Sequence, residues 1–586
     1  MPVSAGPLRA DFDNGDLRCI RLGETEIVRR IYVAFQDRNW TARPWLLDEV
    51  GIDQGHDSFT VTYTARGTFD AEPFTWSVRI TGASDGTIDF GISGRTDAAF
   101  LRNRLGLCVL HPMSLSGQRV LVDHASGGQE ESEFPSEISP NQPFVDVRAL
   151  SHEVRPGLVA RVEMAGDVFE SEDHRNWSDA SFKTYCTPIT LPFPVEVVPA
   201  VPIEQSVRIT LEGDAPRVSP EGDDAGIVLT IGDQTSPLPR IGLQAHPVPL
   251  TEHEAALLAR LRLDHLRIDV PVATREASEI LLTAAAQARA VGCRLRVALI
   301  GGTPDDLARL VDDARSALDL VDCWNVFRPH EKVTGPAAID AARGVLGPDA
   351  VIGGGTDLYF TELNREPPAT SGLDVVNFSL NPQVHSFDDR TLVQNTATQR
   401  VVAENAPRLA GGAAISISPI TLRPRSNPNA TDPDSDVSNG PLPSSVDARQ
   451  RTWFAAAWTT LSLASLAEAG TIDAVTYFET TGWRGVMEAS TGSMDPVNFP
   501  SEPGRTYPVF DVLEAVSGFS RARHLTSSRP EVVGALVVEG ESAARLLLAN
   551  LDEVAHAVAL RGHLEGSHTV PARSVTVIEL PGGPHA

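Results

Sequence analysis

Hydrophobic and polar residues follow two different patterns along this chain, and the pattern changes near residue 238. Before that point, short runs alternate between apolar and polar positions, as at 58–64, 74–80 and 207–211. A period of two, with many β-branched and aromatic residues, is typical of half-buried antiparallel strands. Gly, Asp and Pro separate the runs, and no long amphipathic helix interrupts them. We therefore expect residues 1–235 to form a large amino-terminal β-sandwich.

Beyond residue 238, short continuous apolar stretches alternate with amphipathic helical ones, a pattern typical of parallel strands that are buried on both faces. Eight such strands are predicted, at residues 241–245, 266–270, 295–300, 324–327, 351–355, 375–379, 414–418 and 474–478. Right-handed crossovers close eight parallel strands into a (β/α)8 TIM barrel, which we expect over residues 236–522. A doubly wound open sheet is the alternative. It requires a glycine-rich phosphate turn after the first strand, and the Gln-Ala-His-Pro found there is not one.

Alternation returns after the barrel, at 533–538, 544–549, 555–560 and 574–580. These runs predict a small carboxy-terminal β-sandwich over residues 523–586. Within the barrel, the connection at 423–448 is unusually long and rich in Pro, Asn, Asp and Ser. Loops of that length are usually either functional lids or disordered, and the sequence leaves both open.

Charge and composition narrow the classes of partner. The formal net charge of −28 repels phosphate backbones and anionic lipid, so nucleic acid is not an expected partner. No stretch is apolar enough for a membrane span, and the amino terminus lacks the core of a signal sequence, so we expect a soluble, cytoplasmic protein. Homo-oligomer formation stays open. The cysteines are scattered and never form a C-x-x-C pair, so we expect reduced, mostly buried thiols at Cys19, Cys108, Cys186, Cys293 and Cys323.

Two glutamates stand out at the expected barrel mouth, where polar residues beyond the strand carboxyl ends meet. Glu362 follows the fifth strand and Glu479 follows the eighth, each with few polar neighbours, and burial raises the pKa of such a carboxyl group. A facing pair suits glycosidic or ester hydrolysis, because one group protonates the leaving oxygen while the other attacks or activates water. The structural alternative is that either glutamate pairs with a nearby arginine, such as Arg365 or Arg484, and braces a loop.

The same strand ends supply the candidate substrate-binding residues. They are His246, Asp269, Arg328, His330, Glu331, Asn364, Asn381, His385, Arg423 and Trp483. Any one of the histidines is also compatible with an ordinary hydrogen-bonded loop position. No H-x-H or H-E-x-x-H spacing occurs, and no Walker or dinucleotide fingerprint, so we expect neither a metal nor a cofactor. A serine-hydrolase triad is not expected either, because no G-x-S-x-G elbow lies in a suitable strand and helix.

Outside the barrel, residues 169–185 combine acids, amides, aromatics and bases in one run. Such a run is costly to bury unless its members are paired, so it forms either a solvated hairpin tip or the wall of a site. We favour the wall, because Trp177 and Tyr185 suit stacking on a sugar face. Hydroxyl recognition suits the polar members of the run, Asn176, Asp179 and Lys183.

Four motifs resemble the D-apionate lactonase family of bacterial sugar catabolism. They are Phe-Glu-x-Glu-Asp-x-Arg-Asn-Trp-x-Asp-Ala-Ser-x-Lys-Thr-Tyr at 169–185, Ile-Ser-Pro-x-Gln-Pro-Phe at 138–144, Thr-Glu-Leu-Asn-Arg at 361–365 and Tyr-Phe-Glu-Thr-Thr-Gly-Trp-Arg-Gly at 477–485. The likeness spans nearly the whole chain. It implies an amino-terminal sandwich, a central barrel, a carboxy-terminal β domain and hydrolysis of a sugar-acid lactone to the open acid.

The layout also resembles retaining barrel glycosidases, which place an acid/base after strand four and a nucleophile after strand seven. Here strand four ends Phe-Arg-Pro-His-Glu and strand seven ends Ser-Pro-Ile-Thr, so the two glutamates stand after strands five and eight instead. We therefore predict a hydrolase acting on a small sugar or sugar lactone. The alternatives are a glycoside hydrolase that uses Glu362 and Glu479, and a non-catalytic carbohydrate-binding barrel.

Overall fold

The chain is described from a computed structural model that covers residues 1–38, 40, 45–69, 72–199, 201–213, 226–425 and 440–580. Within the long connection expected at 423–448, residues 426–439 lie outside the described ones. The described residues divide into two compact units. The first holds the residues up to 213 except Asn176–Asp179, and the second holds that short segment together with residues 226–580.

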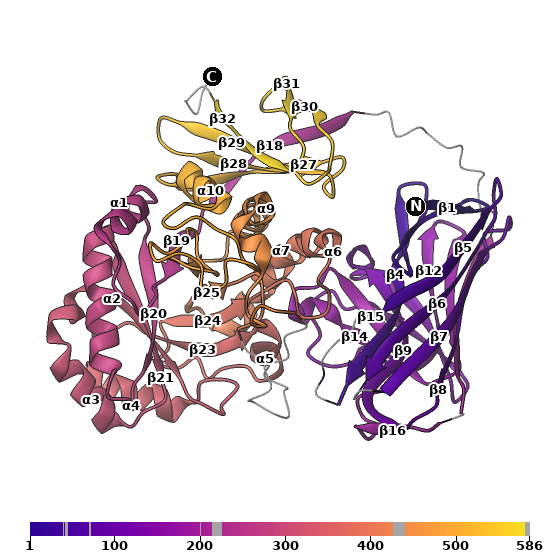
Figure 1. Ribbon diagram of the computed structural model, residues 1–586, viewed down its shortest axis with the longest axis horizontal. Coiled ribbons are helices and arrows are strands. Elements are labelled where there is room, and N and C mark those ends of the chain that lie inside the picture. Colours follow the sequence, from indigo (N-terminus) through magenta and orange to yellow (C-terminus); the bar gives the residue numbers. More distant parts are fainter. Residues whose placement is uncertain are drawn as a thin grey trace. The chain divides into compact units, whose positions relative to one another are not determined.

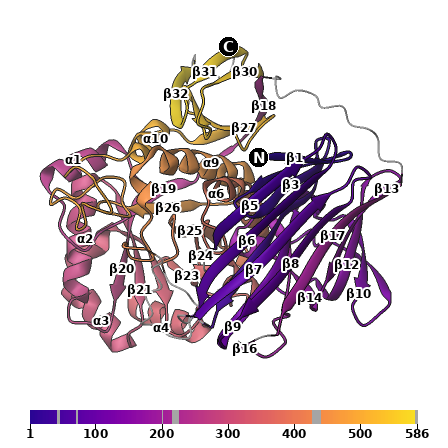
Figure 2. The ribbon, with the colours of Figure 1, turned by 45° about the vertical axis from the view of Figure 1, so that its right-hand side comes forward.

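The first unit is a large antiparallel β-sandwich. Its strands are β1 (Pro2–Ala5), β2 (Leu8–Asp13), β3 (Asp16–Leu22), β4 (Thr25–Asp37), β5 (Leu46–Gln54), β6 (Phe59–Phe69), β7 (Glu72–Gly82), β8 (Ile88–Thr96), β9 (Phe100–Pro112), β10 (Arg119–His124), β11 (Gln129–Glu133), β12 (Phe144–Arg155), β13 (Leu158–Ala165), β14 (Phe169–Asp173), β15 (Ser181–Tyr185), β16 (Val195–Val197) and β17 (Ile203–Gly213). One run of paired strands has the order β5-β6-β7-β8-β17-β13-β12-β10-β11, and the other has the order β1-β2-β3-β4-β9-β15-β14. Figure 2 shows β5, β6, β7 and β8 side by side.

The alternating pattern of the sequence is what places the core of this sandwich. In β7 the side chains of Phe74, Trp76, Val78 and Ile80 are buried, and the residues between them face outward. Successive side chains of a strand point to opposite faces, so this period of two buries one face. All five cysteines of the chain are among the described residues, and each is buried and outside any disulfide, as predicted.

The second unit is built around a closed barrel of eight parallel strands, which confirms the predicted TIM barrel (Figure 1). The strands are β19 (Arg240–Gln244), β20 (His265–Pro271), β21 (Arg294–Ile300), β22 (Val321–Phe327), β23 (Ile352–Tyr359), β24 (Val375–Leu380), β25 (Ala414–Ile420) and β26 (Ala474–Glu479). The helices are α1 (Glu252–Arg260), α2 (Ala277–Val291), α3 (Pro304–Asp313), α4 (Pro336–Leu346), α5 (Phe360–Arg365), α6 (Asp389–Gln394), α7 (Thr396–Asn405), α8 (Pro407–Ala410), α9 (Trp453–Ala469) and α10 (Pro508–Val516).

Local sequence signals start and stop these helices. Thr251 and Glu254 form a capping box that begins α1, and Thr303 and Asp306 do the same for α3. At the other end, α2 stops at Gly292, whose φ of 85° is the left-handed conformation that favours glycine. Among the described residues, no helix is both long and apolar enough to cross a bilayer.

A seven-stranded sheet completes the second unit, in the order β31-β30-β18-β27-β28-β29-β32. Its strands are β18 (Ile227–Pro237), β27 (Arg521–Ser527), β28 (Val533–Glu539), β29 (Ala544–Asn550), β30 (His556–Gly562), β31 (Gly566–Val570) and β32 (Ser574–Leu580). Helix α9 packs against it, and Gly534 permits this, since a Cβ there would lie 2.1 Å from Leu461 Cδ2. The domain boundaries expected at 235 and 522 fall inside β18 and β27. The alternation of β18 looks like that of the sandwich strands, but its partners lie near the end of the chain.

Candidate active site

Glu362 lies in the first turn of α5, just beyond the carboxyl end of β23. Its side chain is 3% exposed, and its Oε2 accepts a hydrogen bond from the Tyr359 backbone N–H at 3.2 Å. Burial raises the pKa of Glu362, and the opposing effects of nearby backbone N–H groups, Lys332 and Arg365 are smaller. A carboxyl group whose pKa is raised keeps its proton to a higher pH and is better suited to donate it.

Tyr359 is the last residue of β23 and is close to several polar groups of the barrel mouth. Its hydroxyl is within hydrogen-bonding reach of the Asn381 side chain. Burial raises the pKa of Tyr359, and the nearby carboxylates of Glu362 and Asp357 raise it further. The phenol is therefore neutral at ordinary pH, and a neutral phenol donates a hydrogen bond.

A closed ring of ion pairs lies at the same mouth. Arg267, fully buried on β20, donates to Asp269 at 2.9 Å and to Asp357 at 2.5 Å. Arg425 bridges the same two carboxylates, Asp269 and Asp357, with its Nη1 3.2 Å from Asp357 Oδ1. Burial acts to raise the pKa of Asp269, but Arg267 and Arg425 outweigh it and hold the pKa below its usual range. Because the two arginines and the two aspartates of this ring neutralise one another, the ring presents a polar surface with little uncompensated charge.

Glu479 ends β26 and is held by an arginine. Arg484 donates Nε to Glu479 Oε1 at 2.9 Å, and its Nη2 lies 2.7 Å from the same oxygen. The residue before it, Phe478, has a φ of 52°, which is a strained conformation for a bulky side chain. The backbone next to Glu479 thus has an unusual conformation. The carboxylate is paired with Arg484, as in the alternative in which the glutamate braces a loop.

The tip of the 169–185 hairpin belongs to the barrel unit. Asn176 Oδ1 accepts from Asn364 Nδ2 at 2.8 Å, so the tip contacts α5 two residues beyond Glu362. Asp179 Oδ2 lies 2.6 Å from His385 Nδ1, in the connection between β24 and α6. The indole of Trp177 lies edge to face with the His385 ring, with centroids 5.3 Å apart. A solvated tip is therefore wrong, because Asn176 and Asp179 are buried.

Four other residues predicted at the barrel mouth are exposed, or have hydrogen bonds that involve the backbone of a neighbouring connection. His330 and Glu331 are exposed on the connection after β22, and the Arg328 guanidinium donates to the Gly302 carbonyl. His246 is half-buried, and its carbonyl accepts from Gln287.

Arg423 and Trp483 each contact neighbouring loop residues. The Arg423 guanidinium stacks on Phe387 at 5.0 Å. The Trp483 indole N–H donates to Ser493 at 2.8 Å. None of these contacts by itself identifies a ligand group.

Lys183 and Tyr185 belong to the first unit, where both have polar partners on β14. Lys183 Nζ donates to Glu172 at 3.1 Å, and the Tyr185 hydroxyl donates to Glu170 at 2.5 Å. Burial acts to lower the pKa of Lys183, but Glu172 outweighs it and raises the pKa. The acids and bases of the two hairpin strands are thus paired with one another, whereas the tip has its partners in the barrel unit.

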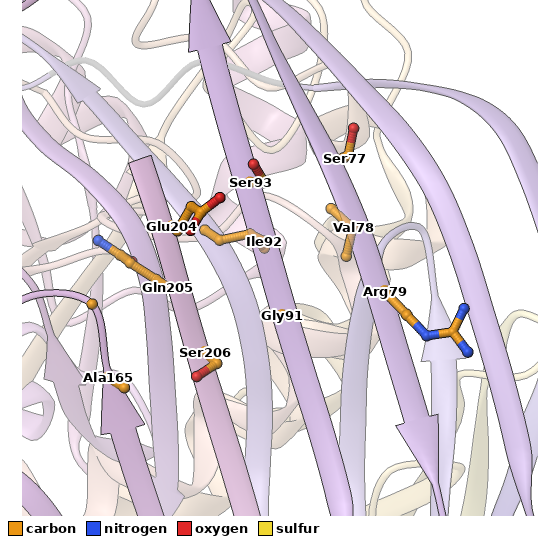
Figure 3. A pocket seen from close by; sticks show the side chains of 11 residues that line it. Ser77, Val78, Arg79, Gly91, Ile92, Ser93, Ala165, Glu204, Gln205 and Ser206 are labelled. Carbon is orange, nitrogen blue, oxygen red and sulfur yellow. The ribbon is translucent and has the colours of Figure 1, made fainter. Parts of the chain in front are cut away.

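The first unit also carries an open groove of about 500 Å³ across β7, β8 and β17 (Figure 3). Ser77, Arg79, Ser93 and Ser206 project from these neighbouring strands. None of its eleven lining residues is aromatic, so the groove lacks the stacking surface that sugar sites commonly use. It is an outward sheet face and not the candidate site.

Sequence reasoning did not single out Asp357, Tyr359 or Asn395. The fifth barrel strand was expected to end at residue 355. In the structure β23 continues to Tyr359, which brings Asp357 and Tyr359 to the barrel mouth. Asn395, at the start of α7, donates to Asp179 at 2.8 Å, a contact across 216 positions that no local pattern reveals.

Comparisons with known proteins bear on both units. Family models described as the D-apionate lactonase N-terminal domain and the D-apionate lactonase TIM barrel domain match residues 1–214 and 240–521. A D-apionate lactonase from Brucella anthropi is 30% identical over 573 residues, which cover 92% of this chain and 91% of that protein.

Among solved structures, similarity is limited. A GH30 endoxylanase from Clostridium papyrosolvens C71 aligns with 61% of this chain and 100% of its own, at 11% identity and a TM-score of 0.41. A family 51 alpha-L-arabinofuranosidase from Bifidobacterium longum aligns with 62% of this chain and 100% of its own, at 12% identity and a TM-score of 0.42. The sequence comparisons are the decisive ones, and they confirm the resemblance seen in the motifs. The chain belongs to the D-apionate lactonase family.

Proposed function

We propose that this protein hydrolyses a sugar-acid lactone to the open acid at the mouth of its TIM barrel. The observation that carries the proposal is the buried carboxyl group of Glu362, whose raised pKa suits proton donation. Membership of the D-apionate lactonase family supports the substrate class, since the relative from Brucella anthropi is named for this reaction.

In the proposed reaction, Glu362 protonates the ring oxygen as it leaves the acyl carbon. Glu479 is the second carboxylate of the pair, as nucleophile or as base for the attacking water. Opening an ester also requires hydrogen-bond donors for the developing oxyanion. Tyr359 and Asn381 are the candidates for that task, because both side chains lie beside one another at the mouth.

A glycoside hydrolase is the second candidate function. Glu362 and Glu479 follow strands β23 and β26, which are three strands apart, the spacing at which a retaining pair faces across a barrel. This reaction requires acid assistance and a carboxylate free to attack, and Arg484 already occupies one oxygen of Glu479.

A panel of five- and six-membered sugar lactones, assayed beside nitrophenyl glycosides, tests the proposal. We expect pH-stat acid release above the spontaneous rate for lactones, and a release about 10²–10⁴-fold slower in Glu362→Gln. Turnover of glycosides alone contradicts the proposal and favours the second candidate. A cytoplasmic location and self-association stay predictions.

A further inference from the structure

Arg425 lies on the connection that follows β25, and its guanidinium contacts residues at the ends of two other barrel strands. Its Nη1 lies 3.2 Å from Asp357 Oδ1, and its Nη2 donates to Asp269 Oδ2. Asp357 belongs to β23 and Asp269 to β20, which are two and three strands away from β25 around the closed barrel. The side chain of Arg425 therefore reaches across the mouth of the barrel.

The other three members of this ring of ion pairs cannot donate to a ligand. Arg267 is fully buried, and its Nε and Nη2 donate to the two aspartates of the ring. Its Nη1 donates to the Ser418 carbonyl. Asp269 and Asp357 are carboxylates, which only accept hydrogen bonds, so neither can bind the carbonyl oxygen of a lactone.

Arg425 itself keeps donors and solvent access. A guanidinium carries five N–H groups, of which each Nη holds two. Within the described part of the chain, Nη1 donates to Asp357, Nη2 donates to Asp269, and Nε has no partner. The side chain of Arg425 is 30% exposed, whereas that of Arg267 is 0% exposed. Arg425 is therefore the member of the ring that can offer N–H groups to a substrate.

The guanidinium of Arg425 also lies within electrostatic reach of the proposed acid and base. Burial acts to lower the pKa of Arg425, but nearby carboxylates, Glu479 among them, outweigh it and raise the pKa. The charge of Arg425 in turn acts on the phenol of Tyr359, whose backbone N–H donates to Glu362. A carbonyl group that reacts between the two glutamates therefore lies in the field of this cation.

We propose that Arg425 binds the carbonyl oxygen of the lactone and stabilises the negative charge that forms on it. This inference rests on the proposed lactone hydrolysis, and it adds a cationic donor to the neutral donors Tyr359 and Asn381. With Glu479 as the base, water loses a proton to it while the water oxygen bonds to the acyl carbon, and the carbonyl electron pair moves onto the carbonyl oxygen. That pair returns as the bond to the ring oxygen breaks, and the ring oxygen takes the proton of Glu362.

Arg425 keeps all of its protons throughout this reaction. Donors stabilise a developing charge best when they are held in place beforehand, and Asp269 and Asp357 hold the guanidinium. The product acid then ionises, and the two glutamates regain their starting protonation by exchange with solvent. Because the product carries a negative charge that the lactone lacks, Arg425 is expected to bind the product acid more strongly than the lactone.

The test measures lactone kinetics and the inhibition constants of two compounds in the full-length protein. One compound is the free acid obtained by alkaline hydrolysis of the same lactone. The other is the cyclic ether with the same ring and hydroxyl groups, which has neither a charge nor a carbonyl group.

Arg425→Gln removes the charge and keeps a polar side chain. We expect kcat to fall by about 10²–10³-fold, the usual cost of removing one oxyanion donor, with KM within a few-fold. The inhibition constant of the acid is expected to rise at least about tenfold, because a charge-assisted hydrogen bond is lost, while that of the ether changes little. Arg425→Lys keeps the charge but not the planar fork, so its acid inhibition is expected to stay near that of the wild type, with kcat between the other two.

Arg240→Gln is the matched control. Arg240 likewise bridges two aspartates, Asp264 at 3.5 Å and Asp473 at 2.6 Å, but it begins β19 and thus lies at the opposite end of the barrel. Its kcat, its KM and both inhibition constants are expected to equal those of the wild type.

Several outcomes overturn the inference. An Arg425→Gln enzyme with near-normal kcat shows that the guanidinium does not serve the reaction. Equal weakening of lactone, acid and ether shows a structural bridge, because a disturbed site affects all ligands alike. If Arg425→Gln does not fold, Arg425→Lys decides, since acid binding that is weakened in spite of the retained charge contradicts the proposed contact. A wild type that opens no lactone removes the proposed function as well, whereas the other outcomes leave it standing.

Discussion

Glu362→Gln replaces the buried acid with a neutral side chain of the same shape. Gln still offers an oxygen to the Tyr359 N–H, the contact measured at 3.2 Å, so the fold of α5 is expected to survive. The transferable proton is lost. Because general acid catalysis typically contributes 10²–10⁴-fold, we expect kcat for lactone opening to fall by that factor, or about 2.7–5.5 kcal/mol of transition-state stabilisation.

The same substitution has a predicted signature in stability against pH. The pKa of Glu362 is raised by burial in the folded state, so its stabilising contribution is complete below the unfolded pKa of about 4.3 and is lost as pH rises through the folded pKa. Glutamine does not ionise, so Glu362→Gln is expected to gain stability over the wild type as pH rises. Each unit of pKa shift adds about 1.4 kcal/mol to that gain in the free energy of unfolding. The gain becomes constant above the folded-state pKa, and its constant value measures the pKa shift.

Glu254→Gln is the control with the opposite sign. Burial acts to raise the pKa of Glu254, but hydrogen bonds from Thr251 and Ser490 outweigh it and lower the pKa. Its stabilising contribution is present above the unfolded pKa and is lost as pH falls, so this variant is expected to be less stable than wild type near neutral pH.

Urea unfolding of both variants and the wild type between pH 4 and pH 8, followed by tryptophan fluorescence, compares the two signs. A Glu362→Gln protein that keeps kcat within threefold of wild type, or that shows no stability gain on raising the pH, refutes the assignment of Glu362 as a buried acid.

Further predictions concern the other members of the site. Glu479→Gln is expected to reduce lactone kcat by about 10²–10⁴-fold, because it removes the proposed nucleophile or base, and steady-state kinetics on lactones measure the loss. Arg267→Met leaves Asp269 and Asp357 facing each other with Arg425 alone, and about 3–5 kcal/mol of unfolding free energy is expected to be lost, measured by urea unfolding. Unchanged stability contradicts that ring of ion pairs.

The sequence predicted the parts of this fold that depend on local pattern. Each of the eight barrel strands lies where a continuous apolar run predicted it, because a strand buried on both faces has an unmistakable composition. β23 was predicted to end at residue 355 but continues to Tyr359, and the short prediction concealed Asp357 and Tyr359.

Contacts between segments far apart in the sequence could not be predicted from local sequence patterns. His385 and Asp179 were both expected near substrate, but their pairing across 206 positions is set by tertiary structure. Likewise, β18 has the alternation of any antiparallel strand, and nothing in its own residues tells that it pairs with β27 and β30.

The position of β18 limits where this chain can be truncated without loss of solubility. The strand precedes the first barrel strand, yet it sits in the middle of the terminal sheet, antiparallel to β27 and parallel to β30. Removal of the residues after the barrel would take away both neighbours of β18. Its two hydrogen-bonding edges would then be exposed, and exposed strand edges promote aggregation. A shortened enzyme that keeps its solubility therefore has to begin before Ile227 and retain the tail through Leu580. The terminal sheet therefore joins the strand that precedes the barrel to the strands that follow it.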